Sequence, residues 1–349
     1  MRAVFERKVP NYYRCWRSTV ISKNKASVII PTKNPGDIIK KVLPVVLSQK
    51  ADFAYEVLVI DSGSTDGTVE YLKGVKAPNF RLVEIPPADF GHGKTRNLGA
   101  ELTDGEYILF LTHDAQPVKD TWLAEMVRAA DQDPLIAGVF GRHIAYAGEN
   151  VFVARELDLH FSGFQTNPIT WMDDKVRYEN DIGYRQFLHF FSDNNSLLRR
   201  SVWLVHKYPD VNFAEDQQWA KAIIEDGWKK GYSHEGVVYH SHHYKVMERL
   251  RRSFDESYAF KRYFGYDLCS SKGKLWRDWK YLTSRDMDYC FKDRVWKRAP
   301  MNCVIQPFDN FARLLGQYLG NHGDSINSAW RHFLSRDTRL FKGSSNGRN

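Results

Sequence analysis

The chain has 349 residues, 43% of them hydrophobic and 26% charged, with a formal net charge of +8, which is the profile of an ordinary globular protein. It contains no run of 18 apolar residues, and its first residues lack the apolar segment of a signal peptide, so we expect neither a transmembrane helix nor a secretory leader. The length allows one large α/β domain with appendages, and we expect a soluble or peripheral protein.

The four cysteines, Cys15, Cys269, Cys290 and Cys303, are scattered and form no CxxC pair. Four cysteines in a chain of this length do not make a disulfide framework. We therefore expect reduced thiols and a cytoplasmic location.

Short apolar segments alternate with amphipathic ones through the first third of the chain. Strands are predicted at 27–31, 56–60, 80–85 and 107–111, and helices at 37–49 and 68–74. This alternation indicates right-handed βαβ units and a parallel sheet. The predicted fold class is α/β, with a mostly parallel sheet flanked by helices.

Two loops after the predicted strands carry candidate ligand groups. In the segment DSGSTDG, Asp61 and Ser62 can accept or donate hydrogen bonds to a ribose or nucleobase, although Asp, Ser and Gly are also what tight turns use. In FGHGKTRNLGA, Lys94 and Arg96 stand near a helix start and suit a diphosphate. The glycines of that segment are equally compatible with a simple turn.

The segment YILFLTHDAQP turns from apolar to polar at Thr112, His113 and Asp114. Ligands bind at the carboxyl ends of strands in open α/β sheets, so Asp114 can hold a divalent cation beside an anionic ligand. The alternative is that Asp114 caps a helix beginning near Val118.

The sheet pattern weakens after Val139. The segment from 141 to 161 reads as a strand followed by a helix, and residues 165–185 read as a polar, mobile loop. Further on, strand alternation in GYSHEGVVYHSHHY puts His240 and His242 on one face, where the pair can supply an imidazole to a metal. The alternative for these histidines is a polar surface.

Four ordered motifs resemble the inverting glycosyltransferases of family 2, which have the GT-A fold. They are PTKN (31–34), VIDSGSTDGT (59–68), FGHGKTRNLGA (90–100) and FLTHDAQP (110–117). Within the family they are most similar to the dTDP-rhamnose-dependent rhamnosyltransferases. The usual Asp-x-Asp metal motif is here Thr112-His113-Asp114, a departure that this branch shares.

The resemblance implies roles for particular residues. Asp216, in the segment FAEDQQW beside Glu215, would be the general base, although an acidic first helical turn is the alternative. Mg²⁺ or Mn²⁺ would bind Asp114 with His242 or His240. The donor nucleotide would lie among Pro31, Thr32, Lys33, Asn34, Asp61, Ser62, Gly93, Lys94, Arg96, Asn97, Thr112, His113 and Asn194.

The implied activity moves L-rhamnose from dTDP-β-L-rhamnose to a hydroxyl of a glycan or lipid-linked glycan. A UDP- or GDP-linked donor remains open. So does a glycan- or nucleic-acid-binding module with a dead catalytic site. A sugar nucleotidyltransferase is disfavoured, because PTKNPGD lacks the Gly-rich signature with Arg and Lys that such enzymes have after their first strand.

The expected organisation is an N-terminal extension (1–26), a glycosyltransferase domain (27–244) and a basic helical region (245–349). The last segment holds 21 Lys and Arg against 11 Asp and Glu, a net charge of +10, and the rest of the chain carries −2. Because the basic residues alternate with aromatic and aliphatic ones, we expect docking on an anionic membrane surface at the inner face of the cell membrane rather than nucleic-acid binding. A solvated basic face is the alternative.

Overall fold

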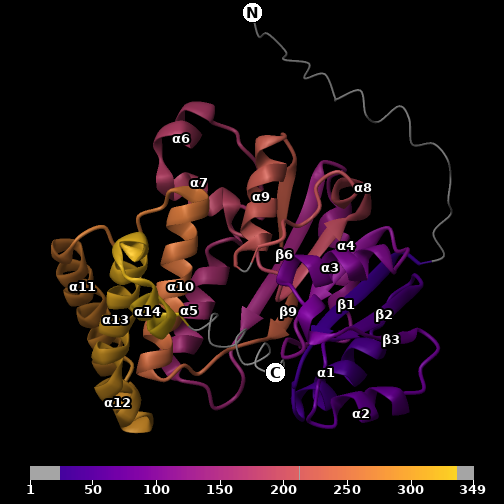
Figure 1. Cartoon of the computed structure of the whole chain (residues 1–349), viewed down its shortest axis with the longest axis horizontal. Coiled ribbons are helices and arrows are strands. Elements are labelled where there is room, and N and C mark those ends of the chain that lie inside the picture. The colour runs from indigo at the N-terminus through magenta and orange to yellow at the C-terminus, as the bar shows by residue number, and fades with distance from the viewer. Residues whose placement is uncertain (1–23, 212, 336–349) are drawn as a thin grey trace, which may run out of the picture.

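The computed structural model describes residues 24–211 and 213–335, which form a nine-stranded mixed sheet flanked by helices, with a helical lobe beside it (Figure 1). The strands are β1 (Ala26–Thr32), β2 (Tyr55–Asp61), β3 (Phe80–Glu84), β4 (Tyr107–Leu111), β5 (Gln116–Pro117), β6 (Ile136–Ile144), β7 (Ile169–Thr170), β8 (Asn195–Arg199) and β9 (Lys229–Tyr239). The helices that flank the sheet are α1 (Ile38–Leu47), α2 (Thr68–Gly74), α3 (His92–Glu101), α4 (Trp122–Asp131), α5 (Val151–Ser162), α6 (Lys175–Asn180), α7 (Ile182–His189), α8 (Arg200–Trp203) and α9 (Glu215–Glu225). The helices of the C-terminal lobe are α10 (Val246–Phe264), α11 (Lys272–Lys292), α12 (Val295–Arg298), α13 (Pro300–Asn321) and α14 (Ser328–Leu334).

The first half of the sheet has the order β3-β2-β1-β4 with every pairing parallel, as predicted. The central strands are apolar on both faces because helices cover both sides, and Ile29, Leu58 and Leu109 are fully buried. The four predicted strands and both predicted helices are confirmed within one or two residues at each end.

The second half of the sheet is mixed, so the predicted weakening of the sheet after Val139 is wrong. Strands β8, β6 and β9 extend the sheet beyond β4, with β8 antiparallel to both of its neighbours. Since β8 runs antiparallel to β4, its first residue, Asn195, pairs with Leu111, which is the last residue of β4. The carboxyl ends of β1, β4, β6 and β9 and the amino end of β8 therefore share one edge.

The segment 165–185, which we expected to be a mobile loop, contains the short strand β7, the helix α6 and the start of α7. Asp174 and Asp181 cap α6 and α7 by accepting hydrogen bonds from backbone amides. At the other end, the buried ammonium of Lys230 on β9 donates to the carbonyls of Phe187 and Phe190 at 2.8 and 2.7 Å. These local caps and one distant lysine hold a polar sequence in helices.

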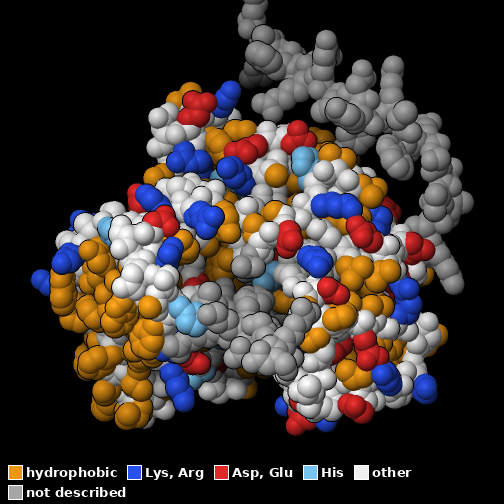
Figure 2. Space-filling view, in the orientation of Figure 1, with side chains coloured by type: hydrophobic (Ala, Val, Ile, Leu, Met, Phe, Trp, Pro, Cys, Tyr) orange, Lys and Arg blue, Asp and Glu red, His pale blue; other side chains and the backbone are white. Residues whose placement is uncertain are grey.

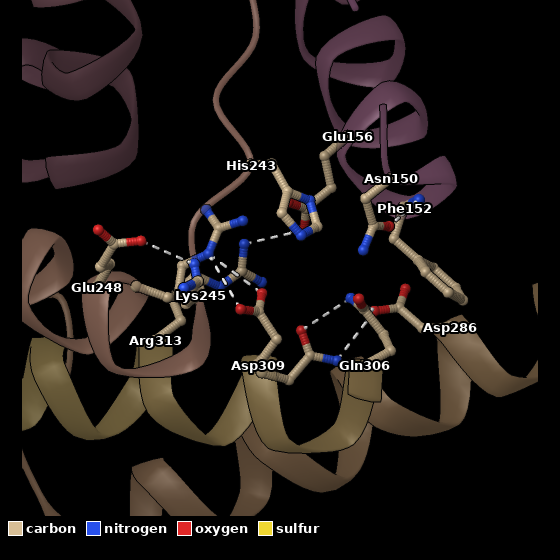
Figure 3. Close-up of polar contacts among 12 residues, drawn as sticks. Asn150, Phe152, Glu156, His243, Lys245, Glu248, Asp286, Gln306, Asp309 and Arg313 are labelled. Atoms are coloured by element: carbon tan, nitrogen blue, oxygen red, sulfur yellow. Dashed lines mark hydrogen bonds and ion pairs between the residues drawn. The ribbon is translucent and has the colours of Figure 1, made fainter. Parts of the chain in front are cut away.

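The C-terminal helices join the sheet region through a polar interface with α5 (Figure 3). The buried Asp286 of α11 accepts a hydrogen bond from Gln306 of α13 at 2.8 Å and lies 3.5 Å from the Arg155 guanidinium of α5. On the same helix Glu156 pairs with Arg313 of α13 at 2.9 Å. Consecutive residues of α5 thus bind two helices of the lobe.

The cysteines differ in part from the expectation. Cys290 and Cys303 form a disulfide between α11 and α13, so the expectation of reduced thiols is wrong for this pair. Cys269 is a buried free thiol, and Cys15 lies outside the described residues.

The expected N-terminal extension, 1–26, falls almost wholly outside the described residues. Within the described ranges no helix is both long and apolar enough to cross a membrane.

Helices α10 and α13 pack closely because glycines of α13 face the backbone of α10. A Cβ atom on Gly316 would lie 2.2 Å from the carbonyl oxygen of Leu250, and one on Gly320 would lie 2.3 Å from that of Phe254. We expect Gly316→Ala to lower the free energy of unfolding by about 1 to 3 kcal/mol, because the two helices must separate. Urea or thermal unfolding measures this change.

Gly273→Ala is the matched control. Gly273 is also helical, in α11, but a Cβ atom there would meet its nearest neighbour at 3.9 Å. That substitution should leave stability unchanged or raise it by up to about 1 kcal/mol through helix propensity. Equal effects of the two substitutions would contradict the close packing of α10 against α13.

Candidate active site

The residues predicted to bind a metal meet at the shared edge of the sheet. Asp114 follows β4, and the short strand β5 directly after it pairs with Val238 and Tyr239 at the end of β9. This pairing brings Asp114 to His240 and His242, whose Nε2 atoms lie 3.6 and 3.7 Å from its carboxylate oxygens. Asp114 is not a helix cap, since Thr121 stands at the start of α4.

This cluster fits a divalent cation. One ligand atom from each of the three residues lies within 4.8 Å of the others, and no other such group occurs in residues 24–211 and 213–335. Atoms that each lie about 2.1 Å from one ion are about 3 to 4 Å apart, which matches the observed separations. Burial acts to raise the pKa of Asp114, but the charges of His240, His113 and His242 outweigh it and lower the pKa. The carboxylate is therefore ionised and ready to bind a cation.

Tyr146, which the sequence analysis did not single out, holds the metal cluster in place. Its hydroxyl donates to the carbonyl oxygen of Asp114 at 2.8 Å, and its ring stacks on Tyr239 with 5.6 Å between centroids. The backbone amide of His240 donates to Ile144 at the end of β6. The segment AYAGEN offered no signal for this role, because the contact depends on β6 lying beside β9.

A second cluster gathers three carboxylates around one guanidinium. Arg96 of α3 lies 3.2 Å from Asp193 and 2.9 Å from Glu215, and all three side chains are buried. The Tyr208 hydroxyl donates to Asp193 at 2.6 Å. Arg96 is therefore occupied by protein carboxylates rather than turned toward a diphosphate, which corrects its predicted role as a donor contact.

Asp216, the predicted base, is the third carboxylate. One of its oxygens accepts from the backbone amide of Asp193 at 3.3 Å and the other from that of Gln217 at 2.8 Å. Burial and the neighbouring charges of Asp193 and Glu215 raise its pKa well above the ordinary value. Burial likewise raises the pKa of Glu215 to about 7, against the opposing charge of Arg96. The cluster holds more acids than one cation can neutralise.

The turn before β8 joins the two clusters. Asp193 contacts Asp216 as described, and the carbonyl of the next residue, Asn194, accepts from the amide of Thr112 at 3.4 Å. Asp114 and Asp216 are a hundred residues apart in the chain, yet each lies within two residues of this turn's hydrogen bonds. The two carboxylates are therefore linked through this turn.

The predicted nucleotide loops after β1 and β2 interlock. The amide of Asn34 donates to Ser64 at 2.8 Å, and the Asn34 side chain accepts from the amide of Thr65 at 2.7 Å. Buried Asp61 accepts from the amides of Gly63 and Ser64 at 2.9 and 2.8 Å. Both Asp61 and Asn34 thus shape the loops, and a contact between Asp61 and a nucleobase stays a prediction.

Several other predicted donor residues have structural roles. The hydroxyl and the amide of buried Ser62 both donate to Thr32 at 3.0 Å. The Asn97 side chain bonds both the carbonyl and the amide of Tyr208, so it is not directed to a ligand. Gly93 is required by packing, since a Cβ atom there would lie 2.2 Å from the carbonyl of Pro209.

The rest of the predicted donor set lines the same sheet edge with varying exposure. Lys94 is exposed in the first turn of α3, and Asn194 and His113 are half-buried beside the metal cluster. Pro31 and Thr32 end β1, with Thr32 buried, and Lys33 is half-buried in the loop that follows. Lys94 is thus the member of the Lys94/Arg96 pair that remains available to a diphosphate.

Comparison with solved structures defines the class of protein. The mannosyltransferase PcManGT from Pyrobaculum calidifontis, solved in complex with GDP-Man and Mn²⁺, matches with a TM-score of 0.52 at 16% identity, covering 93% of this chain and 87% of that one. At this identity the likeness shows the fold, which is the GT-A fold of glycosyltransferases.

Sequence comparison then identifies the family. Residues 27–203 match the model described as glycosyl transferase family 2. The chain is 31% identical to the O-antigen chain rhamnosyltransferase RfbN of Salmonella typhimurium over 86% of this chain and 91% of that protein. It is 27% identical to the O-antigen chain rhamnosyltransferase WbaN of Salmonella anatum over 86% and 90%. The chain belongs to glycosyl transferase family 2 and is a glycosyltransferase.

The buried acidic cluster has a consequence for stability. The pKa of Asp216 is raised on folding, so its ionised form costs folding energy at high pH, and this cost fades as pH falls toward the unfolded value near ~4. Asp216→Asn should therefore be more stable than the native chain at pH 8, by about 1 kcal/mol or more, and the gap should shrink at pH 5. Thermal unfolding at both values measures it.

Asp52→Asn serves as the control, since Asp52 is exposed and lies outside the cluster. Its substitution should leave the melting temperature unchanged at either pH. A gap for Asp216→Asn that widens toward pH 5 would show that the cluster does not strain the fold.

Proposed function

We propose that the chain transfers L-rhamnose from dTDP-β-L-rhamnose to a hydroxyl of a bacterial surface polysaccharide such as an O-antigen, with inversion at the anomeric carbon. The sugar follows from the similarity to RfbN and WbaN along most of their lengths, and the dTDP carrier from the motifs of the rhamnosyltransferase branch. The observation that carries the chemistry is the joining of Asp114 and Asp216 through the turn at Asp193 and Asn194.

In this reaction Asp216 takes the proton of the acceptor hydroxyl. The acceptor oxygen then forms its bond to the anomeric carbon as the bond from that carbon to the diphosphate oxygen breaks, and dTDP leaves. A raised pKa suits Asp216 to this task, since a stronger base takes a hydroxyl proton more readily. Exposed Lys94 at the start of α3 would bind the diphosphate with its positive charge.

Asp114, His240 and His242 would hold the metal ion. A bound divalent cation offsets the negative charge that develops on the leaving diphosphate. Magnesium prefers oxygen ligands, and two of these three ligands are imidazoles, so the site favours Mn²⁺ over Mg²⁺.

We also propose that the C-terminal lobe docks on an anionic membrane surface. On α13, Met301, Val304, Ile305 and Phe308 form a stripe at helical spacing, with 63%, 60%, 40% and 64% of each residue exposed. Figure 2 shows hydrophobic side chains gathered over this part of the lobe, at the lower left.

The charges beside the stripe favour a lipid surface over a second protein. Lys292, Arg294, Lys297 and Arg298 are exposed at the end of α11 and at the start of and along α12. Two exposed acids lie among them: Asp293, and Asp288, which pairs with Lys292 at 3.0 Å. An apolar helix face bordered by Lys and Arg is the arrangement that binds anionic headgroups.

Turnover of Asp216→Asn with different donors tests the proposed base and the proposed donor together. Nucleotide release from dTDP-β-L-rhamnose in the presence of acceptor glycan should fall by two to four orders of magnitude in Asp216→Asn. Binding of dTDP, measured by calorimetry, should stay within a few fold, because Asp216 contacts the acceptor. A variant that keeps most of its activity contradicts the assignment, and faster turnover with UDP-glucose or GDP-mannose refutes the donor.

The second prediction concerns the metal. Chelation should abolish transfer, and Mn²⁺ should restore it at lower concentration than Mg²⁺. His240→Ala should weaken Mn²⁺ binding, followed by paramagnetic resonance, by about 10-fold or more. His243→Ala is the control, since His243 pairs with Glu149 at 3.2 Å instead. Equal Mn²⁺ affinity in both variants would contradict the proposed metal site.

The third prediction concerns the membrane. Val304→Ser with Phe308→Ser should reduce co-sedimentation with phosphatidylglycerol vesicles by about 10-fold or more, because two apolar contacts are lost. Val176→Ser, which alters a residue that is 70% exposed on α6, should not. High salt should weaken binding of the native chain. Failure to bind at low salt, or a dimer that the double substitution dissociates, would overturn the proposal.

A further inference from the structure

A pocket of about 580 Å³ lies between the helices of the sheet region and those of the C-terminal lobe. Its walls come from α5, α7, α9, α10 and α13, and this volume falls within the range of about 300 to 1,000 Å³ for small-molecule sites. Neither the metal cluster nor the predicted donor residues line it. A ligand of this pocket would therefore be a molecule other than the donor nucleotide.

Four polar side chains reach this pocket from four different helices. Gln186, Gln217, Glu256 and Gln317 are each half-buried, and none of their side-chain ends hydrogen-bonds to another group in the described part of the chain. Half-buried polar groups without protein partners require water or a ligand. Amides both donate and accept, and a carboxylate accepts, which matches the hydroxyl groups of a sugar.

Aromatic rings form the rest of the wall. Phe164 stacks on Phe187 with 5.3 Å between centroids, and His160 meets Phe190 edge to face at 4.6 Å. Phe260 of α10 closes the side facing the lobe. Flat apolar rings beside hydrogen-bonding amides suit a ligand that has both C–H faces and hydroxyls, as a pyranose does.

The pocket is linked to both clusters through neighbouring residues. Gln217 lines it and follows the base, Asp216, whose carboxylate accepts the Gln217 backbone amide at 2.8 Å. On the other side, His160 lines it and precedes Phe161, which packs on His143 at 4.5 Å, and His143 in turn packs on the metal ligand His240 at 5.2 Å. Asp216 itself is not a lining residue, so the pocket is linked to the proposed base through the first turn of α9.

We propose that this pocket binds an uncharged sugar residue at the end of the acceptor glycan that receives the transferred sugar. The proposal rests on the function proposed above, since it requires Asp216 as the base. Among the lining residues, all of which lie in the described ranges, there is no Lys or Arg and one acid, Glu256. Such a wall repels a uronic acid or a phosphate and accepts a neutral hexose.

Binding of simple glycosides to the full chain tests the proposal without turnover. The probes are methyl α-L-rhamnoside, methyl α-D-mannoside and methyl α-D-galactoside, with methyl α-D-glucuronide as the charged analogue, followed by saturation-transfer NMR. At least one neutral glycoside should bind saturably, and the glucuronide should bind at least 10-fold more weakly. Glu256→Ala with Gln317→Ala should weaken neutral binding by about 10-fold or more, and Gln317→Trp, which fills the pocket, should abolish it.

The matched control is Gln165→Ala with Glu179→Ala, which removes one exposed glutamine and one exposed glutamate outside the pocket. It should bind as the native chain does, and dTDP affinity in every variant reports that the donor half is folded. Binding that survives in both pocket variants, equal binding of the glucuronide, or no saturable neutral binding to the native chain each overturns the proposal. The outcome is separate from the donor assignment, because dTDP-rhamnose can fail as donor while the glycosides still bind.

Discussion

The arrangement of the site depends on one buried guanidinium. Arg96 ties helix α3 to the turn before β8 through Asp193 and to the start of α9 through Glu215. A buried charge is tolerated only when it is paired, and here one cation faces three acids, including Asp216. The two ion pairs of Arg96 hold three distant segments together. Burial, and then the charges of Asp193 and Glu215, raise the pKa of Asp216.

The two halves of the sheet make different contributions. The parallel half presents interlocked loops after β1 and β2, where small residues keep the backbone close. The mixed half brings the reactive groups, because the reversed strand β8 starts where β4 ends, and because the pairing of β5 with β9 joins Asp114 to His240. If β8 ran parallel to β4, its amino end and the Asp193 turn would lie at the opposite edge of the sheet.

The sequence was informative wherever a local pattern determined the outcome. Apolar runs located the first four strands. His240 and His242 do lie with Asp114, as predicted, but they follow the end of β9 and are not part of a strand. The sequence was misleading where contacts with residues distant in the chain determine the structure or the role of a side chain. Arg96 resembled a diphosphate ligand because its partner Glu215 lies 119 residues away. The helix α7, which begins in the polar segment 165–185, has carbonyls at its end that bind Lys230 from another strand. Such pairings leave no local period in the sequence.

If the proposed acceptor pocket is correct, the C-terminal lobe is part of the acceptor side of the protein and not an appendage. Helix α5 faces the lobe through Arg155 and Glu156, while one turn later His160 lines the pocket, as does Gln217 of α9. The lobe in turn supplies Glu256 and Gln317 to that pocket and carries the exposed apolar stripe on α13. A lipid-linked glycan is amphiphilic, with a membrane-bound end and a sugar end. A lobe that binds lipid on one surface and sugar on another would hold both ends of such an acceptor and bring its terminal hydroxyl to the base.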